Sequence, residues 1–428
     1  MKLSCLFITG LMFVAGSLLA EEDLFTLYGR VQEAWKQKDY ANVMALSQRL
    51  LSMAPGHSGV QFQYARALAA NNRTGEALKV LASIARMGGA PPAREDEAFL
   101  KMHGHSEFQS ILSAFEKNRT ALGSSTVAFT IPGKNLIPEG IAYDPVEKNF
   151  YIGSTYRRKI VQVSATGITS EFAGEKENGL WGMIGMEVDP VRRHLWANTA
   201  NTGARTPMID PEPSTEGKTA IFKFDLKSRK LIKKYETGTM ENSRFFNDVA
   251  IASNGDVYIS ESNTGEIYRI TAKKDELELF VPASGMEFPN GIAISPDGGW
   301  LYVAHVAGIT VLDLSSGTKQ LLTGPPDSQL GGHDGLIFYK NSLIGMQALT
   351  GGVERIVRLH LNKPEHVDRI EVLQVNHPLF ALPTTGDVAG DQFYYIANSQ
   401  LRSFDEKGVI FPAEKLKDPV ILKIDLSR

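Results

Sequence analysis

Six positions of the sequence occupy the same place in a recurring phrase, and four of them carry oxygen ligands. The phrase is an apolar strand, a turn and an aromatic-rich strand, and its copies start at Glu139, Ile184, Asn247, Asn290, Asp334 and Thr385. In a circular repeat fold, equivalent positions meet in a ring although they are far apart in the sequence. Such a ring would contain two carboxylates and two carboxamides, with no Lys or Arg to balance the charge.

Converging oxygen atoms with two uncompensated charges suit a hard divalent cation, and Ca²⁺ tolerates irregular geometry better than Mg²⁺ does. The alternative is that the Asn-Gly and Asp-Gly pairs only form turns. Glu139 is a poor turn former, however, and all four residues share one register. We therefore expect Glu139, Asn247, Asn290 and Asp334 to bind Ca²⁺, or another divalent cation in its place.

The spacing of the copies indicates the elements that position this ring. Their starts are separated by 45, 63, 43, 44 and 51 residues, which fits a four-stranded propeller blade with loop insertions. Six copies predict an all-β six-bladed propeller over residues 125–428. Val127–Ile131 and Val420–Ile424 can share one blade and so close the ring, which removes an open sheet edge.

Residues 21–119 have a different, helical pattern, in which apolar residues recur every three or four positions. The step from the Trp35–Tyr40 region to the Tyr64–Ala77 region is close to the 34-residue period of tetratricopeptide helix pairs, and Pro55 falls where such a repeat ends. The sequence thus predicts a small all-α helical-repeat domain before the propeller. This domain either presents a groove to a protein partner or caps the propeller.

The first 20 residues resemble a secretory signal peptide, with Lys2, an apolar run and small residues before Ala20. An uncleaved membrane anchor is the alternative. Cys5 is the single cysteine, so cleavage would leave a chain without thiols or disulfides. We expect a periplasmic or secreted protein with no membrane contact in its mature form. The formal charge of −3 disfavours nucleic acid as a partner.

Several of these segments also resemble the regucalcin and gluconolactonase family of six-bladed propellers and, more distantly, the paraoxonases. The resemblance covers about residues 125–428 and is carried by Pro138-Glu139-Gly140, Asn247-Asp248, Pro289-Asn290-Gly291, Pro296-Asp297-Gly298 and Asp334-Gly335. It implies one catalytic divalent metal, usually calcium, held by Glu139, Asn247, Asn290 and Asp334. Paraoxonases have a second, structural calcium. Gly140 stands where that site needs an acidic residue, so we do not expect it here.

Four further residues are candidates for the site. His305 ends the strand that returns to the ring, and His333 precedes Asp334, so either could transfer a proton. Trp181 and Arg205 lie in long connections around the second copy, where they could contact substrate, Arg205 through a substrate carboxylate. For each of the four, ordinary structural packing is the alternative.

Together these features predict a calcium-dependent hydrolase of a lactone or a related ester. A bound Ca²⁺ can polarise a carbonyl oxygen, and the resemblance implies that Asp334 orients the attacking water. The alternative function is a non-catalytic periplasmic propeller that binds a small ligand or a partner protein. Ile184 and Thr385 occupy two ring positions without ligand groups, and they leave this choice open.

Overall fold

The computed structural model describes residues 23–203, 206–283, 285–349 and 351–427. The predicted signal peptide and Cys5 lie outside these residues. Among the described residues, no helix is long and apolar enough to cross a membrane.

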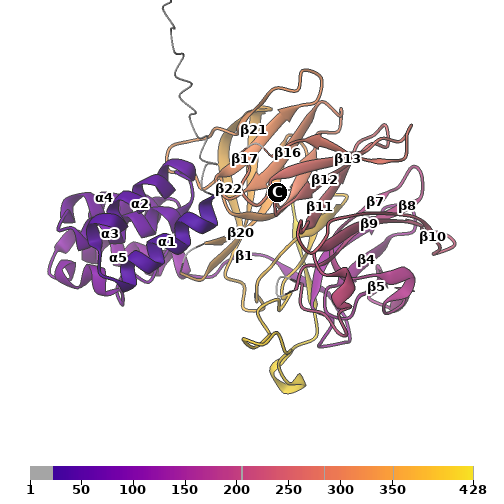
Figure 1. Ribbon diagram of the computed structural model, residues 1–428, viewed down its shortest axis with the longest axis horizontal. Coiled ribbons are helices and arrows are strands. Elements are labelled where there is room, and N and C mark those ends of the chain that lie inside the picture. The colour runs from indigo at the N-terminus through magenta and orange to yellow at the C-terminus, as the bar shows by residue number, and fades with distance from the viewer. Residues whose placement is uncertain (1–22, 204–205, 284, 350, 428) are drawn as a thin grey trace, which may run out of the picture.

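A compact helical domain comes first in the chain. Its helices are α1 (Leu24–Lys36), α2 (Tyr40–Met53), α3 (Ser58–Ala70), α4 (Thr74–Arg86), the 3₁₀ helix η1 (Glu97–Met102) and α5 (Ser106–Arg119). Asp23 caps α1 by accepting a 2.9 Å hydrogen bond from the backbone N–H of Thr26, and Asp39 caps α2 in the same way. The helices lie together on one side of the propeller (Figure 1).

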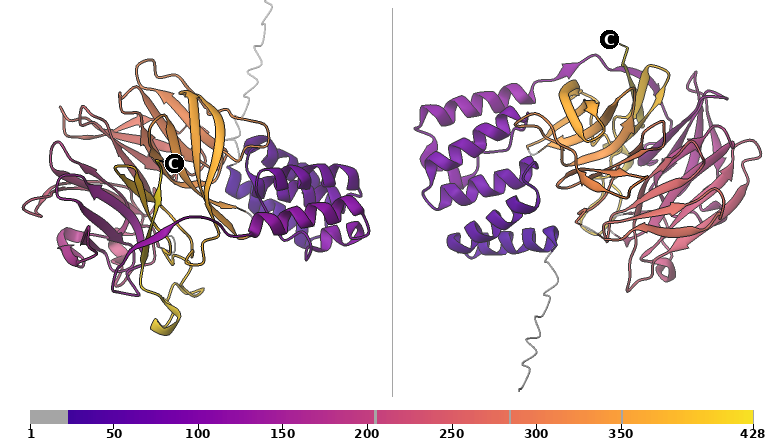
Figure 2. Two further views of the ribbon diagram at one scale, coloured as in Figure 1. Left: turned by 180° about the vertical axis from the view of Figure 1, so that it is seen from behind. Right: turned by 90° about the horizontal axis from the view of Figure 1, so that it is seen from above.

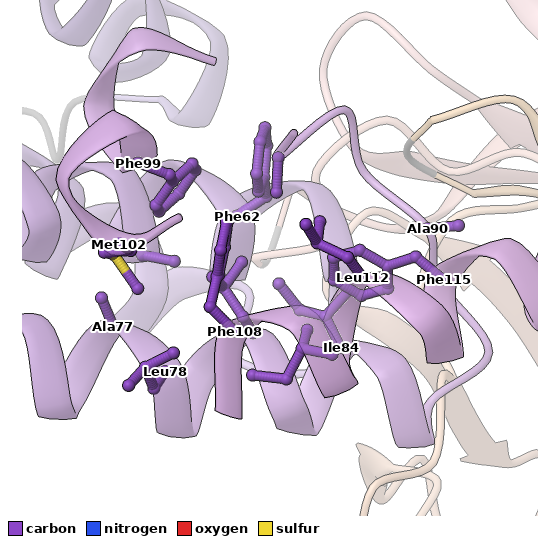
Figure 3. Close-up of a cluster of buried hydrophobic side chains, with 14 of the residues drawn as sticks. Phe62, Ala77, Leu78, Ile84, Ala90, Phe99, Met102, Phe108, Leu112 and Phe115 are labelled. Carbon is purple, nitrogen blue, oxygen red and sulfur yellow. The ribbon is translucent and has the colours of Figure 1, made fainter. Parts of the chain in front are cut away.

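The core of this domain is aromatic. Figure 3 shows Phe62, Phe99 and Phe108 in one buried cluster. The ring centroid of Phe99 lies 5.8 Å from that of Phe62 and 6.1 Å from that of Phe108. Val353 and Val375 of the propeller belong to the same cluster. The two parts of the chain therefore share a hydrophobic core.

The rest of the chain forms six sheets in the described residues, which confirms the six-bladed propeller. Blade 1 contains β3 (Pro138–Asp144), β4 (Asn149–Ser154), β5 (Lys159–Ser164) and β6 (Thr169–Ala173). Blade 2 contains β7 (Gly182–Asp189), β8 (His194–Asn201), β9 (Lys218–Asp225) and β10 (Leu231–Thr237). Blade 3 contains β11 (Phe246–Ile251), β12 (Val257–Glu261), β13 (Glu266–Ile270) and β14 (Leu277–Val281).

The second half of the ring has the same antiparallel order. Blade 4 contains β15 (Ile292–Ile294), β16 (Trp300–His305), β17 (Gly308–Asp313) and β18 (Lys319–Leu321). Blade 5 contains β19 (His333–Phe338), β20 (Ser342–Leu349), β21 (Val353–Lys363) and β22 (His366–Val375), and the linker strand β1 (Leu122–Gly123) pairs with β22. Figure 2 shows the helices next to this orange blade.

Blade 6 closes the ring with strands from both ends of the propeller. It contains β23 (Gly386–Ala389), β24 (Gln392–Ile396), β25 (Val420–Asp425) and β2 (Thr126–Thr130). β2 pairs antiparallel with β25, with Thr130 opposite Val420. This is the predicted closure, and it satisfies sheet edges that would otherwise be open.

Candidate metal centre at the channel mouth

The innermost strands of neighbouring blades are hydrogen bonded to one another where they begin, at the end of the channel that we call the mouth. The backbone N–H of Gly291 donates to the carbonyl oxygen of Asp334 at 2.8 Å, and the N–H of Gly335 donates to that of Thr384 at 2.8 Å. The hydroxyl of Thr384 donates to the carbonyl oxygen of Glu139 at 3.2 Å. These bonds join blades 4, 5, 6 and 1 at the repeat position that the sequence singled out.

The glycines at this level allow the strands to approach so closely. A Cβ atom on Gly140 would overlap the carbonyl oxygen of Ile184, and one on Gly291 would lie 2.5 Å from the carbonyl oxygen of Asp334. A Cβ atom on Gly185 would likewise lie 2.5 Å from the carbonyl oxygen of Asn247. Most copies of the repeat therefore need glycine directly after the ring position, because any side chain there would push the blades apart.

Bulges in the innermost strands change the direction of the side chains at the mouth. The strand register shifts between Pro138 and Gly140, around Glu139, and between His333 and Leu336, around Asp334. A similar shift surrounds Asn247 in β11. Since β-bulges turn a side chain away from the regular alternation of a strand, they account for the presentation of these residues.

Two of the four predicted ligands are in direct contact. The side-chain amide of Asn290 donates a 2.8 Å hydrogen bond to Oδ1 of Asp334. The side-chain amide of Asn247 donates to the hydroxyl of Ser262 at 3.0 Å. The side-chain nitrogen atoms of Asn247 and Asn290 are thus used in hydrogen bonds, and their side-chain oxygen atoms are the atoms that could bind a cation.

The carboxylates of the ring are buried, and Glu139 lies near other carboxylates. Burial raises the pKa of Glu139 well above its ordinary value, and the nearby charges of Asp334 and Asp248 raise it further. Burial likewise raises the pKa of Asp334 to about 7. Oε2 of Glu139 is buried and has no hydrogen-bond partner among the described residues.

This donor set fits a divalent cation of the calcium type. It offers carboxylate and carboxamide oxygens, and the orphaned Oε2 of Glu139 is the kind of buried atom that a cation satisfies. The described residues contain no group of three or more His, Cys, Asp or Glu side chains placed to hold a metal ion. Any site at the mouth therefore depends on Asn247 and Asn290.

Three more carboxylates lie deeper in the propeller, and the sequence analysis did not select them as site residues. Burial raises the pKa of Asp248 to about 7 and that of Asp387 to about 6. The pKa of Glu187 is raised well above its usual range by burial and then by Asp387. Glu187 and Asp387 line a cavity of about 290 Å³ whose other walls are mainly apolar.

Glu187 and Asp387 could have been found in the sequence. Each stands two or three positions after its ring residue, where most copies of the repeat have an apolar residue. Asp387 accepts backbone hydrogen bonds from Tyr143 at 2.7 Å and from Val388 at 2.6 Å. Asp387 therefore links blade 6 to blade 1, besides carrying charge into the channel.

The two candidate histidines are buried and uncharged at neutral pH. Burial lowers the pKa of His305 to about 4, and its Nε2 lies 2.9 Å from the hydroxyl of Thr310. Burial and the charge of Arg355 lower the pKa of His333 to about 3. Nδ1 of each has no hydrogen-bond partner among the described residues.

The surroundings of His333 differ from those of a ring residue. Its Nε2 is 3.0 Å from Nε2 of Gln347, and its Nδ1 lies so close to Gly345 that a Cβ there would overlap it. The imidazole thus packs against β20 within its own blade. This placement favours a structural role for His333.

Of the two other predicted substrate contacts, the structure describes only Trp181. Trp181 is only 3% exposed and packs in a hydrophobic cluster shared by blades 1 and 2, with Nζ of Lys234 at 4.2 Å from its ring centroid. A side chain packed in this way offers little surface to a substrate. Arg205 lies outside the described residues.

Comparisons with known proteins agree with this architecture. Residues 137–338 match the family model described as SMP-30/Gluconolactonase/LRE-like region, and residues 34–93 match a tetratricopeptide repeat model. No curated protein sequence matches the chain at a significant level.

Several solved structures have a chain trace similar to that of this protein. A gluconolactonase from Xanthomonas campestris is 13% identical, with 70% of this chain and 88% of that chain covered and a TM-score of 0.47. A luciferin-regenerating enzyme is 15% identical, with coverages of 71% and 96% and a TM-score of 0.48. A calcium-binding protein, regucalcin from Agrobacterium tumefaciens, is 13% identical, with coverages of 70% and 93% and a TM-score of 0.44.

Residues 137–338 of the chain are thus similar to the SMP-30/Gluconolactonase/LRE-like region, and residues 34–93 are similar to a tetratricopeptide repeat.

Proposed function

We propose that this protein is a metal-dependent hydrolase of a lactone or a related ester, with Ca²⁺ as its preferred cation. One observation supports the proposal: Glu139 and Asp334 are buried with raised carboxylate pKa values, and Asn290 donates a 2.8 Å hydrogen bond to Asp334. The match to the gluconolactonase-like family model supports the same class of reaction.

Glu139, Asn247, Asn290 and Asp334 would hold the cation through oxygen atoms. When bound, Ca²⁺ would polarise the substrate carbonyl and stabilise the negative charge that develops on its oxygen. Asn290 fixes one oxygen of Asp334 through its 2.8 Å hydrogen bond. The other oxygen of Asp334 can then orient a water molecule and accept its proton.

His305 would play a secondary part. Its low pKa keeps the imidazole neutral, and Thr310 fixes the ring through Nε2. The unpartnered Nδ1 can therefore donate or accept a proton, according to its tautomer. This atom could hold a substrate hydroxyl or help the leaving alcohol to depart.

The test is turnover of a panel of lactones and aryl esters by the chelator-treated protein, before and after addition of Ca²⁺. Ring opening that appears only with Ca²⁺, or with another divalent cation, supports the proposal. No hydrolysis of any panel member under either condition would contradict it.

The second candidate is a binding module without catalysis, and the tetratricopeptide match at residues 34–93 favours it. Calcium-dependent ligand binding without turnover would support this alternative. For either function we propose a periplasmic or secreted location, because residues 1–20 have the signal-peptide pattern and residues 21–428 contain no cysteine.

A further inference from the structure

The helical domain contacts the propeller at loops that adjoin the metal ring. At the start of α1, the ring of Phe25 lies 5.8 Å from that of Phe288, edge to face, and Phe288 is two positions before Asn290. Val306 and Ala307, directly after His305, pack against the apolar cluster formed by α1, α2 and α3. The helices therefore touch the connections that carry two residues of the site.

A third contact leads towards Asp334. The backbone N–H of Ser58, at the start of α3, donates a buried 3.0 Å hydrogen bond to Oε1 of Gln329. Nε2 of Gln347 donates to the carbonyl oxygen of Gln329 at 2.8 Å and lies 3.0 Å from Nε2 of His333. The connection that delivers Asp334 is thus anchored on the helical domain.

An apolar rim begins at the ring itself and ends on α1. We define it as Ile184, Phe245, Phe288 and Phe25. Ile184 occupies the ring position between Glu139 and Asn247, and it packs in one cluster with Phe245 and Phe288. The rings of Phe245 and Phe288 are 6.4 Å apart. The rim therefore runs without interruption from the ring to the helical domain.

The exposure of these side chains changes along the rim. Ile184 is 3% exposed and Phe245 is 7% exposed, whereas Phe25 at the outer end is 52% exposed. The apolar surface that the rim offers is therefore that of Phe25 and of the half-buried Phe288 beside it, two positions before Asn290. A polar group placed against it would lose hydrogen bonds to water without replacement, while an alkyl or aromatic group would gain by burial.

We propose that α1 is part of the substrate site and that Phe25 binds the apolar portion of a lactone or ester whose carbonyl lies at the metal ring. This inference rests on the proposed function. Under this proposal the helical domain contributes to substrate selection. Phe25 would then determine specificity although it lies outside the propeller. The preferred substrate carries an alkyl chain or an aryl group beside its carbonyl.

The test compares two substrates that share one reactive ring, γ-butyrolactone and γ-nonanoic lactone, on the full-length calcium-loaded protein. Phe25→Ala should lower kcat/KM for γ-nonanoic lactone by roughly five- to tenfold and leave that for γ-butyrolactone unchanged. Phe25→Leu should retain most of the preference, because it keeps an apolar side chain. Leu100→Ala is the matched control, since Leu100 is 58% exposed on η1 of the same domain.

An equal change for both lactones, or no change for either, would overturn the proposal. If the wild-type protein hydrolyses neither lactone, the proposed function fails, and calorimetric binding of γ-nonanoic lactone decides the inference. Binding at least fivefold weaker to Phe25→Ala than to Leu100→Ala would then support the apolar rim. Equal binding by the two variants, or none by the wild type, would overturn it.

Discussion

The side-chain amide of Asn290 donates a 2.8 Å hydrogen bond to Oδ1 of Asp334, although 44 positions separate the two residues in the sequence. The backbone repeats this link, since the N–H of Gly291 donates to the carbonyl oxygen of Asp334. Blades 4 and 5 are therefore joined at the residues that would bind the cation. Cation affinity and the alignment of these blades should depend on each other.

Calcium should stabilise the folded protein. A cation that binds only the native state adds about 2.7 kcal/mol to the free energy of unfolding at a hundredfold excess over Kd. Chelator-treated protein should thus melt at a lower temperature than calcium-loaded protein. Glu139→Gln should reduce this gain, because it removes a charged ligand whose Oε2 is buried without a partner. Differential scanning calorimetry with a calcium titration measures both effects, and equal melting temperatures with and without Ca²⁺ would refute the metal site.

Asp334→Ala should abolish lactone hydrolysis, whereas His305→Ala should reduce it less. Asp334 would serve both as a metal ligand and as the group that orients water, so its removal affects two requirements at once. His305 can contribute proton transfer, an effect of about 10² to 10⁴-fold when a residue is the general acid or base. Steady-state kinetics on variants shown to be folded by circular dichroism provide the comparison. Wild-type turnover by a folded, calcium-loaded Asp334→Ala protein would eliminate the mechanism.

Glu187→Gln should stabilise the protein more at pH 8 than at pH 5. The pKa of Glu187 is raised in the folded state, chiefly by burial and then by Asp387. A raised carboxylate pKa means that the folded state binds more protons than the unfolded state above pH 4.5, so the wild type loses stability as pH rises through this window. Replacement by Gln removes this pH-dependent loss of stability, so we expect the free energy of unfolding to increase by roughly 1 kcal/mol or more at pH 8.

Urea denaturation at the two pH values measures the effect of Glu187→Gln. Glu147→Gln is the control, because Glu147 is exposed on the turn between β3 and β4. The difference between wild type and Glu147→Gln should not change with pH. A Glu187→Gln protein with the same relative stability at both values would show that this carboxylate is not destabilised in the channel.

Gly351→Ala should weaken the attachment of the helical domain, and the adjacent Gly352→Ala supplies a matched control. Both glycines have left-handed backbone angles, φ 86° and 78°. A Cβ on Gly351 would overlap the carbonyl oxygen of Ala90, whereas a Cβ on Gly352 would meet no atom within 4 Å. Gly352→Ala should therefore cost about 1 to 2 kcal/mol from backbone strain alone.

Gly351→Ala should carry the same strain and a steric clash in addition, worth a further 1 to 3 kcal/mol or so. Urea denaturation would measure the difference, and limited proteolysis would show whether the 87–96 segment becomes accessible. Equal stability of the two variants would mean that the contact between Gly351 and Ala90 is not needed for docking.

The sequence alone was sufficient to predict the propeller and the repeat position that begins each of its blades. Each copy contains its own strand pattern, its turn and, in most cases, a glycine after the ring position, so one blade can be recognised without the others. The closure by β2 and β25 was also predictable, because a circular sheet leaves its terminal strands no other partner. The register alone also predicted Glu139 and Asp334 as ligands.

Only the tertiary structure decided which side chains contact one another inside the propeller. His333 is adjacent to Asp334 in the sequence, yet it packs against Gly345, because the bulge at Asp334 breaks the regular alternation of β19. Glu187 and Asp387 become neighbours in the channel only when blades 2 and 6 are placed around it. Phe25 of the helical domain contacts Phe288 of the propeller, and a contact between two domains has no period in the sequence from which it could be predicted.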